Sequence, residues 1–171
     1  GRLQSFQYML ENTTPISSPD VYAKLSNPGE NVYSDIRHII RKEIFCYIPA
    51  FKAALMSVGL EYSIYAKLAL GAKKSSEYDF VVIDAESTFD GEKTMLFDIA
   101  DKVIIVTEQS ISAVNATNAL ISNINGTNSD KYVFVCNKFE KENYNALIDP
   151  DMTVKFNINE YVDWINVNGR I

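Results

Sequence analysis

Cysteine and histidine are scarce in this sequence of 171 residues, and their scarcity excludes several kinds of site. The two cysteines, Cys46 and Cys136, each lie in an apolar run, where a free thiol usually behaves as a small buried hydrophobe. The single histidine, His38, has no second histidine to join it, so neither a zinc site nor a Ser-His-Asp triad can be assembled. We therefore expect two buried thiols without metal or redox chemistry.

Basic residues are fewer than acidic ones, and long apolar runs are absent from the sequence. Sixteen Lys and Arg residues face 22 Asp and Glu residues, a net charge of −6, which is the wrong sign for a broad surface that binds nucleic acid. No run approaches the roughly 20 apolar residues of a membrane span, and the first residues lack the apolar core of a signal peptide. A length of 171 residues fits one domain over 1–171. These features predict a cytoplasmic protein without a nucleic-acid partner.

Three short apolar runs, each followed by a polar residue, are the strongest local signals. They are Phe80–Ile83 before Asp84, Val103–Val106 before Thr107, and Tyr132–Cys136 before Asn137. Consecutive apolar positions are typical of strands covered on both faces, whereas a surface strand would alternate. We therefore predict three central strands of a parallel sheet.

Helical patterns separate these runs. The second and third are joined by a stripe with three- and four-residue steps, closed by Asn125 and Gly126: Ile111, Val114, Thr117, Ile121 and Ile124. The spacing also predicts helices over 36–42 and 60–68 and strands over 44–48 and 153–156. Alternating strands and helices predict the α/β class, with three layers and a mostly parallel sheet that has helices on both faces.

Ligands of open α/β sheets bind beyond the carboxyl ends of the strands, which places Asp84, Thr107 and Asn137 at the expected site. A carboxylate that leaves a buried strand, such as Asp84, is well placed to hold a hydrated Mg²⁺ ion. The following loop, 85–91, adds two acids, two hydroxyls and a glycine. An alternative is that Asp84 and Asp90 only cap the next helix.

The order of several segments resembles a known family. The segments are Tyr47–Ala50, Tyr78–Asp84, Ile99–Thr107, Ser110–Asn115 and Val135–Lys138. Together they resemble the MinD/ParA (SIMIBI) group of P-loop ATPases, most of all the CpaE-type pilus-assembly and septum-site ATPases. The resemblance runs from about Arg2 to about Leu147 and implies a P-loop NTPase-like fold.

The resemblance also implies functional roles. Asp84 would be the catalytic residue that holds the Mg²⁺ shell or the attacking water, Glu86 and Ser87 would belong to the switch loop, and Asn137, with Lys138, would contact the adenine base. The intact family member would hydrolyse ATP with Mg²⁺ as a homodimer, together with protein partners of a pilus, secretion or positioning machinery. Membrane contact is not expected, because the aromatic C-terminal segment carries Glu160 and Asp163.

One feature of these ATPases is missing. No glycine of this chain directly precedes a Lys-Ser or Lys-Thr pair, the signature of the loop whose backbone N–H groups cradle phosphate. The nearest approximation, 71–76, follows no apolar strand. The N-terminal phosphate-binding portion of the family is apparently missing, either from a fragment or by natural loss. We therefore predict that this chain alone binds ATP weakly or not at all.

Two other functions stay open. A receiver-like phosphoacceptor domain would use Asp84, Asp90, Thr107 and Lys138, but the upstream strand ends without the acids that such a domain needs for Mg²⁺. A nucleotide-free interaction module would instead offer a basic helix face (Arg37, His38, Arg41, Lys42) and the aromatic segment Tyr161–Ile165. A phosphate adduct that is lost in Asp84→Asn would favour the receiver.

Overall fold

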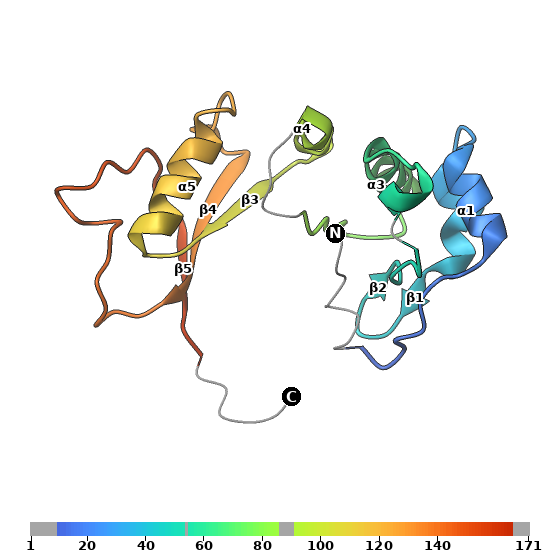
Figure 1. Ribbon diagram of the computed structural model, residues 1–171, viewed down its shortest axis with the longest axis horizontal. Helices are drawn as coiled ribbons and strands as arrows, with labels where there is room; N and C mark the ends of the chain where they lie inside the picture. Colours follow the sequence, from blue (N-terminus) through green and yellow to red (C-terminus); the bar gives the residue numbers. More distant parts are fainter. Residues whose placement is uncertain (1–9, 54, 86–90, 166–171) are drawn as a thin grey trace. The chain divides into compact units, whose positions relative to one another are not determined.

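The computed structural model describes residues 10–53, 55–85 and 91–165, and the chain divides into two compact units, Gly1–Ile99 and Ala100–Ile171 (Figure 1). The N-terminal unit is mainly helical. Its elements are α1 (Pro19–Ser26), α2 (Val32–Ile36), the 3-10 turn η2 (Arg37–Ile39), β1 (Arg41–Lys42), β2 (Cys46–Tyr47), the 3-10 turn η3 (Leu55–Val58), α3 (Ser63–Ser75) and α4 (Gly91–Ile99).

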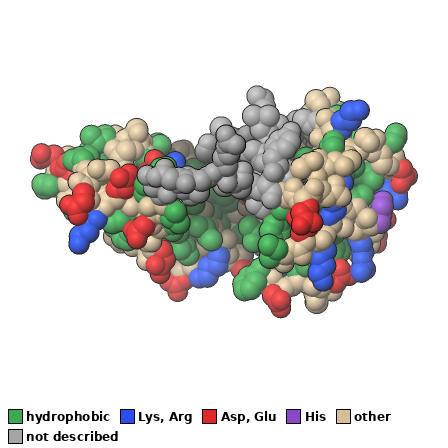
Figure 2. Space-filling model, turned by 90° about the horizontal axis from the view of Figure 1, so that it is seen from below, with side chains coloured by type: hydrophobic (Ala, Val, Ile, Leu, Met, Phe, Trp, Pro, Cys, Tyr) green, Lys and Arg blue, Asp and Glu red, His purple; other side chains and the backbone are tan. Residues whose placement is uncertain are grey.

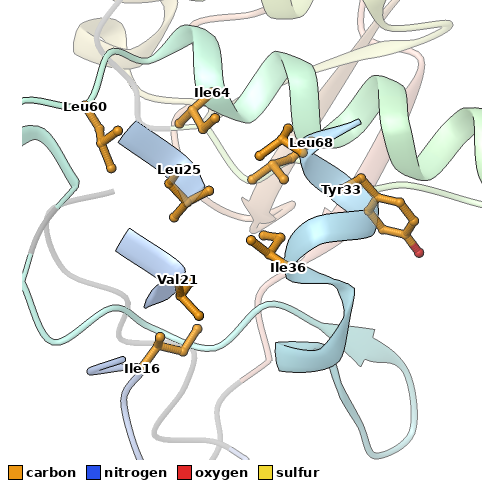
Figure 3. Close-up of a cluster of buried hydrophobic side chains, with 9 residues drawn as sticks. Ile16, Val21, Leu25, Tyr33, Ile36, Leu60, Ile64 and Leu68 are labelled. Carbon is orange, nitrogen blue, oxygen red and sulfur yellow. The ribbon is translucent and has the colours of Figure 1, made fainter. Parts of the chain in front are cut away.

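The core of the N-terminal unit brings α1, α2 and α3 together (Figure 3). Its buried side chains include Val21 and Leu25 of α1, Ile36 of α2, and Ile64 and Leu68 of α3. The last two lie on the helix predicted over 60–68; a helix is confirmed there, but α3 begins at Ser63 and runs on to Ser75. Burying these side chains removes apolar surface from water, at about 25 cal/mol per Å².

Tyr33 closes one edge of this core and carries its hydroxyl out of it (Figure 3). The ring is 3% exposed, and the hydroxyl donates a hydrogen bond to Glu77 at 2.9 Å. Arg37 forms an ion pair with the same carboxylate, also at 2.9 Å. Burial, followed by the hydrogen bond with Tyr78, raises the pKa of Tyr33. The cluster therefore ties α2 to the segment that follows α3.

Two predictions for the segment 36–48 are wrong. The helix expected over 36–42 breaks at Ile40, and Arg41 and Lys42 form β1, so the four basic residues share no helix face. The strand expected over 44–48 shrinks to Cys46–Tyr47 and pairs antiparallel with β1. Because the two strands form a small hairpin outside the core, Cys46 is exposed and not buried as predicted.

The apolar run Phe80–Ile83 also departs from its prediction. These residues are not in a strand, and Phe80 and Val82 are each 87% exposed. A strand needs a neighbour for its N–H and C=O groups, and none of the described residues forms a ladder with this run. The hydrophobic pattern gave the right composition for a strand, but pairing decides whether one forms.

The C-terminal unit is a parallel three-stranded sheet with one long helix. Its elements are β3 (Val103–Thr107), α5 (Ile111–Ile121), β4 (Tyr132–Phe139) and β5 (Glu160–Asp163), and the strand order is β3-β4-β5 (Figure 1). In register, Ile105 lies beside Phe134 and Cys136 lies beside Tyr161. The α/β class, the parallel sheet and two of the predicted strands are therefore confirmed. The central position predicted for Val103–Val106 is wrong, because β3 lies at an edge of the described sheet and exposes Ile104 and Val106.

Helix α5 covers one face of this sheet. Its buried side chains are Val114, Thr117 and Ile121, three of the five positions of the predicted stripe. Ile111 is instead 49% exposed, and the helix ends at Ile121 and not at Asn125. Ser110 caps it by accepting a hydrogen bond from the backbone N–H of Ala113.

The segment 140–159 lies between β4 and β5 and contains no strand, so the strand predicted over 153–156 is wrong. Phe156 instead stacks on Phe134 of β4, with ring centroids 5.1 Å apart. The third strand of the sheet is Glu160–Asp163, all of whose residues are exposed. An exposed strand with two acids lacks the run of apolar residues that predicts a buried strand.

Charged side chains are spread over the surface. On the face drawn in Figure 2, acidic and basic side chains are interspersed among hydrophobic ones in both units. Among the described residues, no helix is both long and apolar enough to cross a membrane.

Candidate functional site: a cleft at the carboxyl ends of the strands

The parallel strands of the C-terminal unit end at a shared edge, and an open cleft of about 1080 Å³ lies there. It receives residues from each strand end: Glu108 follows β3, Lys138 belongs to β4, and Trp164 follows β5. The lining is completed by the residues after β3, the first turns of α5 and the loop after β4: Gln109, Ser110, Ile111, Ser112, Asn115, Glu140, Asn143 and Tyr144. This is the position where open α/β sheets bind ligands.

Lys138 lies at the centre of this arrangement because of an irregularity in β4. The register between β4 and β5 shifts between Cys136 and Phe139, and Lys138 has a left-handed φ of 52°. Bulges of this kind redirect side chains, and they are common beside functional sites. The ammonium lies 2.9 Å from Glu108 and 6.0 Å from the centroid of the Trp164 ring. The bulge thus aims a cation between an acid and an aromatic face.

Gln109 joins the end of β3 to the loop after β4. Its side chain is buried, with Nε2 donating to the carbonyls of Glu140 (3.1 Å) and Tyr144 (2.8 Å). Its Oε1 accepts from the N–H of Glu140 at 2.9 Å, and its backbone carbonyl accepts from the N–H of Ala146 at 2.9 Å. Two carbonyls on one side and an N–H on the other leave a single amide orientation that satisfies all partners.

The lining favours a planar ring over a polyanion. Tyr144 is 55% exposed and Trp164 is 48% exposed, so both offer aromatic surface. The hydroxyl of Tyr144 is bound by Asp149, and this hydrogen bond raises the pKa of Tyr144 and lowers the pKa of Asp149. The charged groups of the lining are two acids, Glu108 and Glu140, and one base. Stacking on aromatic faces is available there, whereas the charge opposes a triphosphate.

The residues predicted from the sequence are only partly gathered at this cleft. Lys138 lines it; Asn137 is half-buried on β4 and is not among the lining residues. Asp84 is exposed in the N-terminal unit, and Glu86 and Ser87 lie outside the described residues. Within the described part of the chain, no three His, Cys, Asp or Glu side chains cluster in a way that could hold a metal ion. The roles of Asp84, Glu86, Ser87 and Asn137 stay predictions.

Thr107, which was also predicted at a strand end, has a structural role. It is 4% exposed, and its hydroxyl is hydrogen bonded to that of Thr117 on α5 at 2.9 Å. A receiver-like domain would need this hydroxyl free to face a phosphoryl group. Its burial between β3 and α5 therefore weighs against the receiver interpretation.

Sequence reasoning missed the cleft residues Gln109 and Tyr144, and it singled out Trp164 only as part of the aromatic segment Tyr161–Ile165 and not as a site residue. Gln109 follows Thr107 by two positions, so extending the search beyond the strand end would have found it. Tyr144 and Trp164 carry no such signal, because one lies in a loop and the other follows a strand that the sequence did not predict.

A second hollow, of about 500 Å³, lies in the N-terminal unit between residues 11–14 and the β1-β2 hairpin. Its polar groups bind one another. Glu43 accepts hydrogen bonds from Tyr47 at 2.8 Å and from the N–H groups of Glu11 and Asn12, which lowers its pKa, the bond from Tyr47 having the largest effect. Arg41 donates to the carbonyl of Asn12 at 3.0 Å. These hydrogen bonds therefore fix Glu11 and Asn12 on the hairpin.

Comparison with known proteins supports the fold. A ParA family ATPase from Chlorobium tepidum TLS has a similar structure, with a TM-score of 0.65 and 15% sequence identity. The match covers 92% of this chain but 64% of the other, so this chain spans less than two thirds of that protein. No protein-family model matches the sequence, and the search of curated proteins gave no match. The chain therefore has an α/β fold similar to that of a ParA family ATPase.

Proposed function

We propose that this chain is part of a ParA-like ATPase and that its cleft holds the base of the nucleotide. The observation that carries the proposal is the cleft at the carboxyl ends of β3, β4 and β5, where Lys138 lies beside the ring of Trp164. The fold similarity supports the same assignment. A purine offers a planar ring for the aromatic surface and nitrogen acceptors for the ammonium group.

We also propose that the chain alone holds ATP weakly. The 171 residues contain no Gly-Lys-Ser or Gly-Lys-Thr sequence, and the cleft carries more acid than base. A few hydrogen bonds to the base, at about 0.5–1.5 kcal/mol net each, give at best millimolar binding once the entropy of association is counted. In the intact protein, Asp84 would hold Mg²⁺ through water, Glu86 and Ser87 would belong to the switch loop, and Asn137 would help to recognise adenine.

The process that such an ATPase serves is a finer proposal. The sequence resemblance to CpaE-type proteins favours pilus or secretion assembly, or the spatial organisation of cell components, by a cytoplasmic homodimer with protein partners. ATP hydrolysis would belong to the intact protein, and this chain by itself would be inactive.

Trp164 makes the base site directly testable, because it is the only tryptophan and gives a single indole N–H signal in a ¹H–¹⁵N spectrum. We expect adenosine and ATP to shift this signal with millimolar saturation, whereas tripolyphosphate leaves it in place. Calorimetry with ATP and Mg²⁺ should show no micromolar binding. A stationary indole signal with adenosine would contradict the base site, and micromolar ATP affinity would contradict the expected weakness.

The same titration separates the alternative functions. A nucleotide-free interaction module predicts no shift with any nucleotide, and the exposed apolar run Phe80–Ile83 is the feature of the structure that favours it. A receiver predicts an acetyl phosphate adduct, measured by intact mass, that disappears in Asp84→Asn.

A further inference from the structure

We infer that Gln109 is the positioning residue of the cleft: it fixes the loop 140–146 as the wall that gives the site its preference for a purine. The inference rests on the proposed function, because it assigns how the same cleft selects its ligand. Its basis is the buried side chain of Gln109, whose amide makes three hydrogen bonds to one loop.

The side chain of Gln109 holds the loop 140–146 in place. Gln109 is 8% exposed, and its amide meets two carbonyls and one N–H of the loop. The carbonyls belong to Glu140 and Tyr144, which both line the cleft. Because a buried polar group left unpaired costs more than a typical hydrogen bond contributes, the loop is best satisfied in this one position.

The loop carries Tyr144, an aromatic residue that lines the cleft. Tyr144 is fixed at both ends, by its backbone carbonyl on Gln109 and by its hydroxyl on Asp149. A ring held in this way can present a face to a planar ligand without losing further rotamer entropy on binding. Losing the amide of Gln109 would remove one of the two anchors of this ring and leave the loop tied to position 109 only through the N–H of Ala146.

The third step concerns the neighbouring residue. Glu108 directly precedes Gln109 and holds the ammonium of Lys138 at 2.9 Å, so adjacent residues after β3 fix two sides of the cleft. The Glu108–Lys138 pair is half-exposed on both sides, and such pairs contribute little to rigidity. The buried amide of Gln109 is therefore the stronger constraint of the two.

The test compares Gln109→Met, which conserves length but removes all three side-chain hydrogen bonds, with the wild-type chain. We expect the amide of Glu140 to lose at least about tenfold in hydrogen-exchange protection, since its acceptor is gone. Adenosine, followed by the Trp164 indole signal, should bind about tenfold more weakly, and the preference for adenosine over uridine should disappear.

Two further variants keep the outcome interpretable. Gln109→Glu keeps the shape of the side chain but sets a carboxylate against two carbonyls, so it should weaken adenosine binding even if Gln109→Met fails to fold. Asn118→Ala is the matched control. Asn118 binds the backbone of Thr153 and Lys155 in the same way, but outside the cleft, so its loss should leave adenosine binding unchanged.

The outcomes are distinguishable from those of the proposed function. If the wild-type indole signal does not respond to adenosine, the base site itself is wrong, and the role of Gln109 is wrong with it. If the wild type binds adenosine and a folded Gln109 variant binds it equally well with the same preference over uridine, only the positioning role is overturned. Equal losses in Asn118→Ala would also overturn it, because they would show a general effect on stability.

Discussion

Gly71 of α3 lies directly against Tyr33 of α2: a β-carbon added at Gly71 would stand 2.4 Å from the β-carbon of Tyr33. Real side chains do not come this close, so the two helices pack at a distance that only glycine permits here. Residues 71–76, the nearest approximation to a phosphate loop in the sequence, therefore have a different role. Gly71 belongs to the interior of a helix, and its lack of a side chain serves packing.

Gly71→Ala should therefore destabilise the N-terminal unit by about 1–3 kcal/mol, because overpacking outweighs the gain of about 1 kcal/mol in helix propensity. The measurement is native-state hydrogen exchange at Leu68, which lies in the same helix. Gly91→Ala is the control: Gly91 begins α4, and an added β-carbon meets nothing within 4 Å. An increase in stability for Gly71→Ala would contradict the packing argument.

Tyr33→Phe should change how stability depends on pH at the alkaline end. Burial raises the pKa of Tyr33 above its usual 10.0, so the folded state prefers the protonated hydroxyl. The stability gained is complete below pH 10 and is lost as pH rises beyond it, toward the folded pKa. The wild type should thus lose stability above pH 10 more steeply than Tyr33→Phe. Identical slopes between pH 9 and pH 11, measured by denaturant unfolding, would contradict this expectation.

The two thiols should differ sharply in reactivity. Cys46 is exposed on the hairpin, whereas Cys136 is buried in β4, and burial together with the charge of Glu108 raises the pKa of its thiol. Since the thiolate is the reactive form, Cys136 should react with a disulfide reagent only on unfolding. In the native protein, one equivalent of the disulfide reagent should react rapidly, and in the Cys46→Ser variant none should react rapidly. Rapid reaction of two equivalents with the native protein would show that Cys136 is accessible.

These cases show how far the sequence could predict the structure. Val103–Thr107 and the stripe of α5 were predictable because their apolar side chains are partly buried, at alternate positions of the strand and along one side of the helix. Phe80–Ile83 has an equally apolar pattern, but a strand depends on a partner that the pattern does not contain. Glu160–Asp163 forms a strand with no apolar pattern at all, because β4 supplies its hydrogen-bond partners.

The cleft was predictable in position but only partly in composition. The rule that ligands meet the carboxyl ends of parallel strands predicts a site at the edge after β3, and the cleft lies at that edge. It did not give the bulge that redirects Lys138, nor the loop that brings Tyr144 to the same place. Both depend on backbone geometry between strands, to which local hydrophobic patterns are blind.

Lys138 allows stability and function to be separated, because its backbone is in a conformation that favours glycine. Lys138→Gly and Lys138→Ala both remove the ammonium from Glu108 and Trp164, but only glycine adopts a φ of 52° without a steric cost. We therefore expect Lys138→Gly to be about 1 kcal/mol more stable than Lys138→Ala. Both should show the same weakened response of the Trp164 indole signal to ATP, since both lack the cation.

The matched control is Lys141→Ala, which removes an exposed lysine that does not line the cleft. It should leave both the stability and the response to ATP within error of the wild type. Denaturant unfolding measures the first quantity, and the indole titration measures the second. If Lys138→Gly responded to ATP like the wild type, the cation would have no part in the site, and the bulge would be a feature of the strand alone. If instead the glycine variant were more stable than the wild type yet weaker toward ATP, Lys138 would be a residue whose strained backbone serves binding.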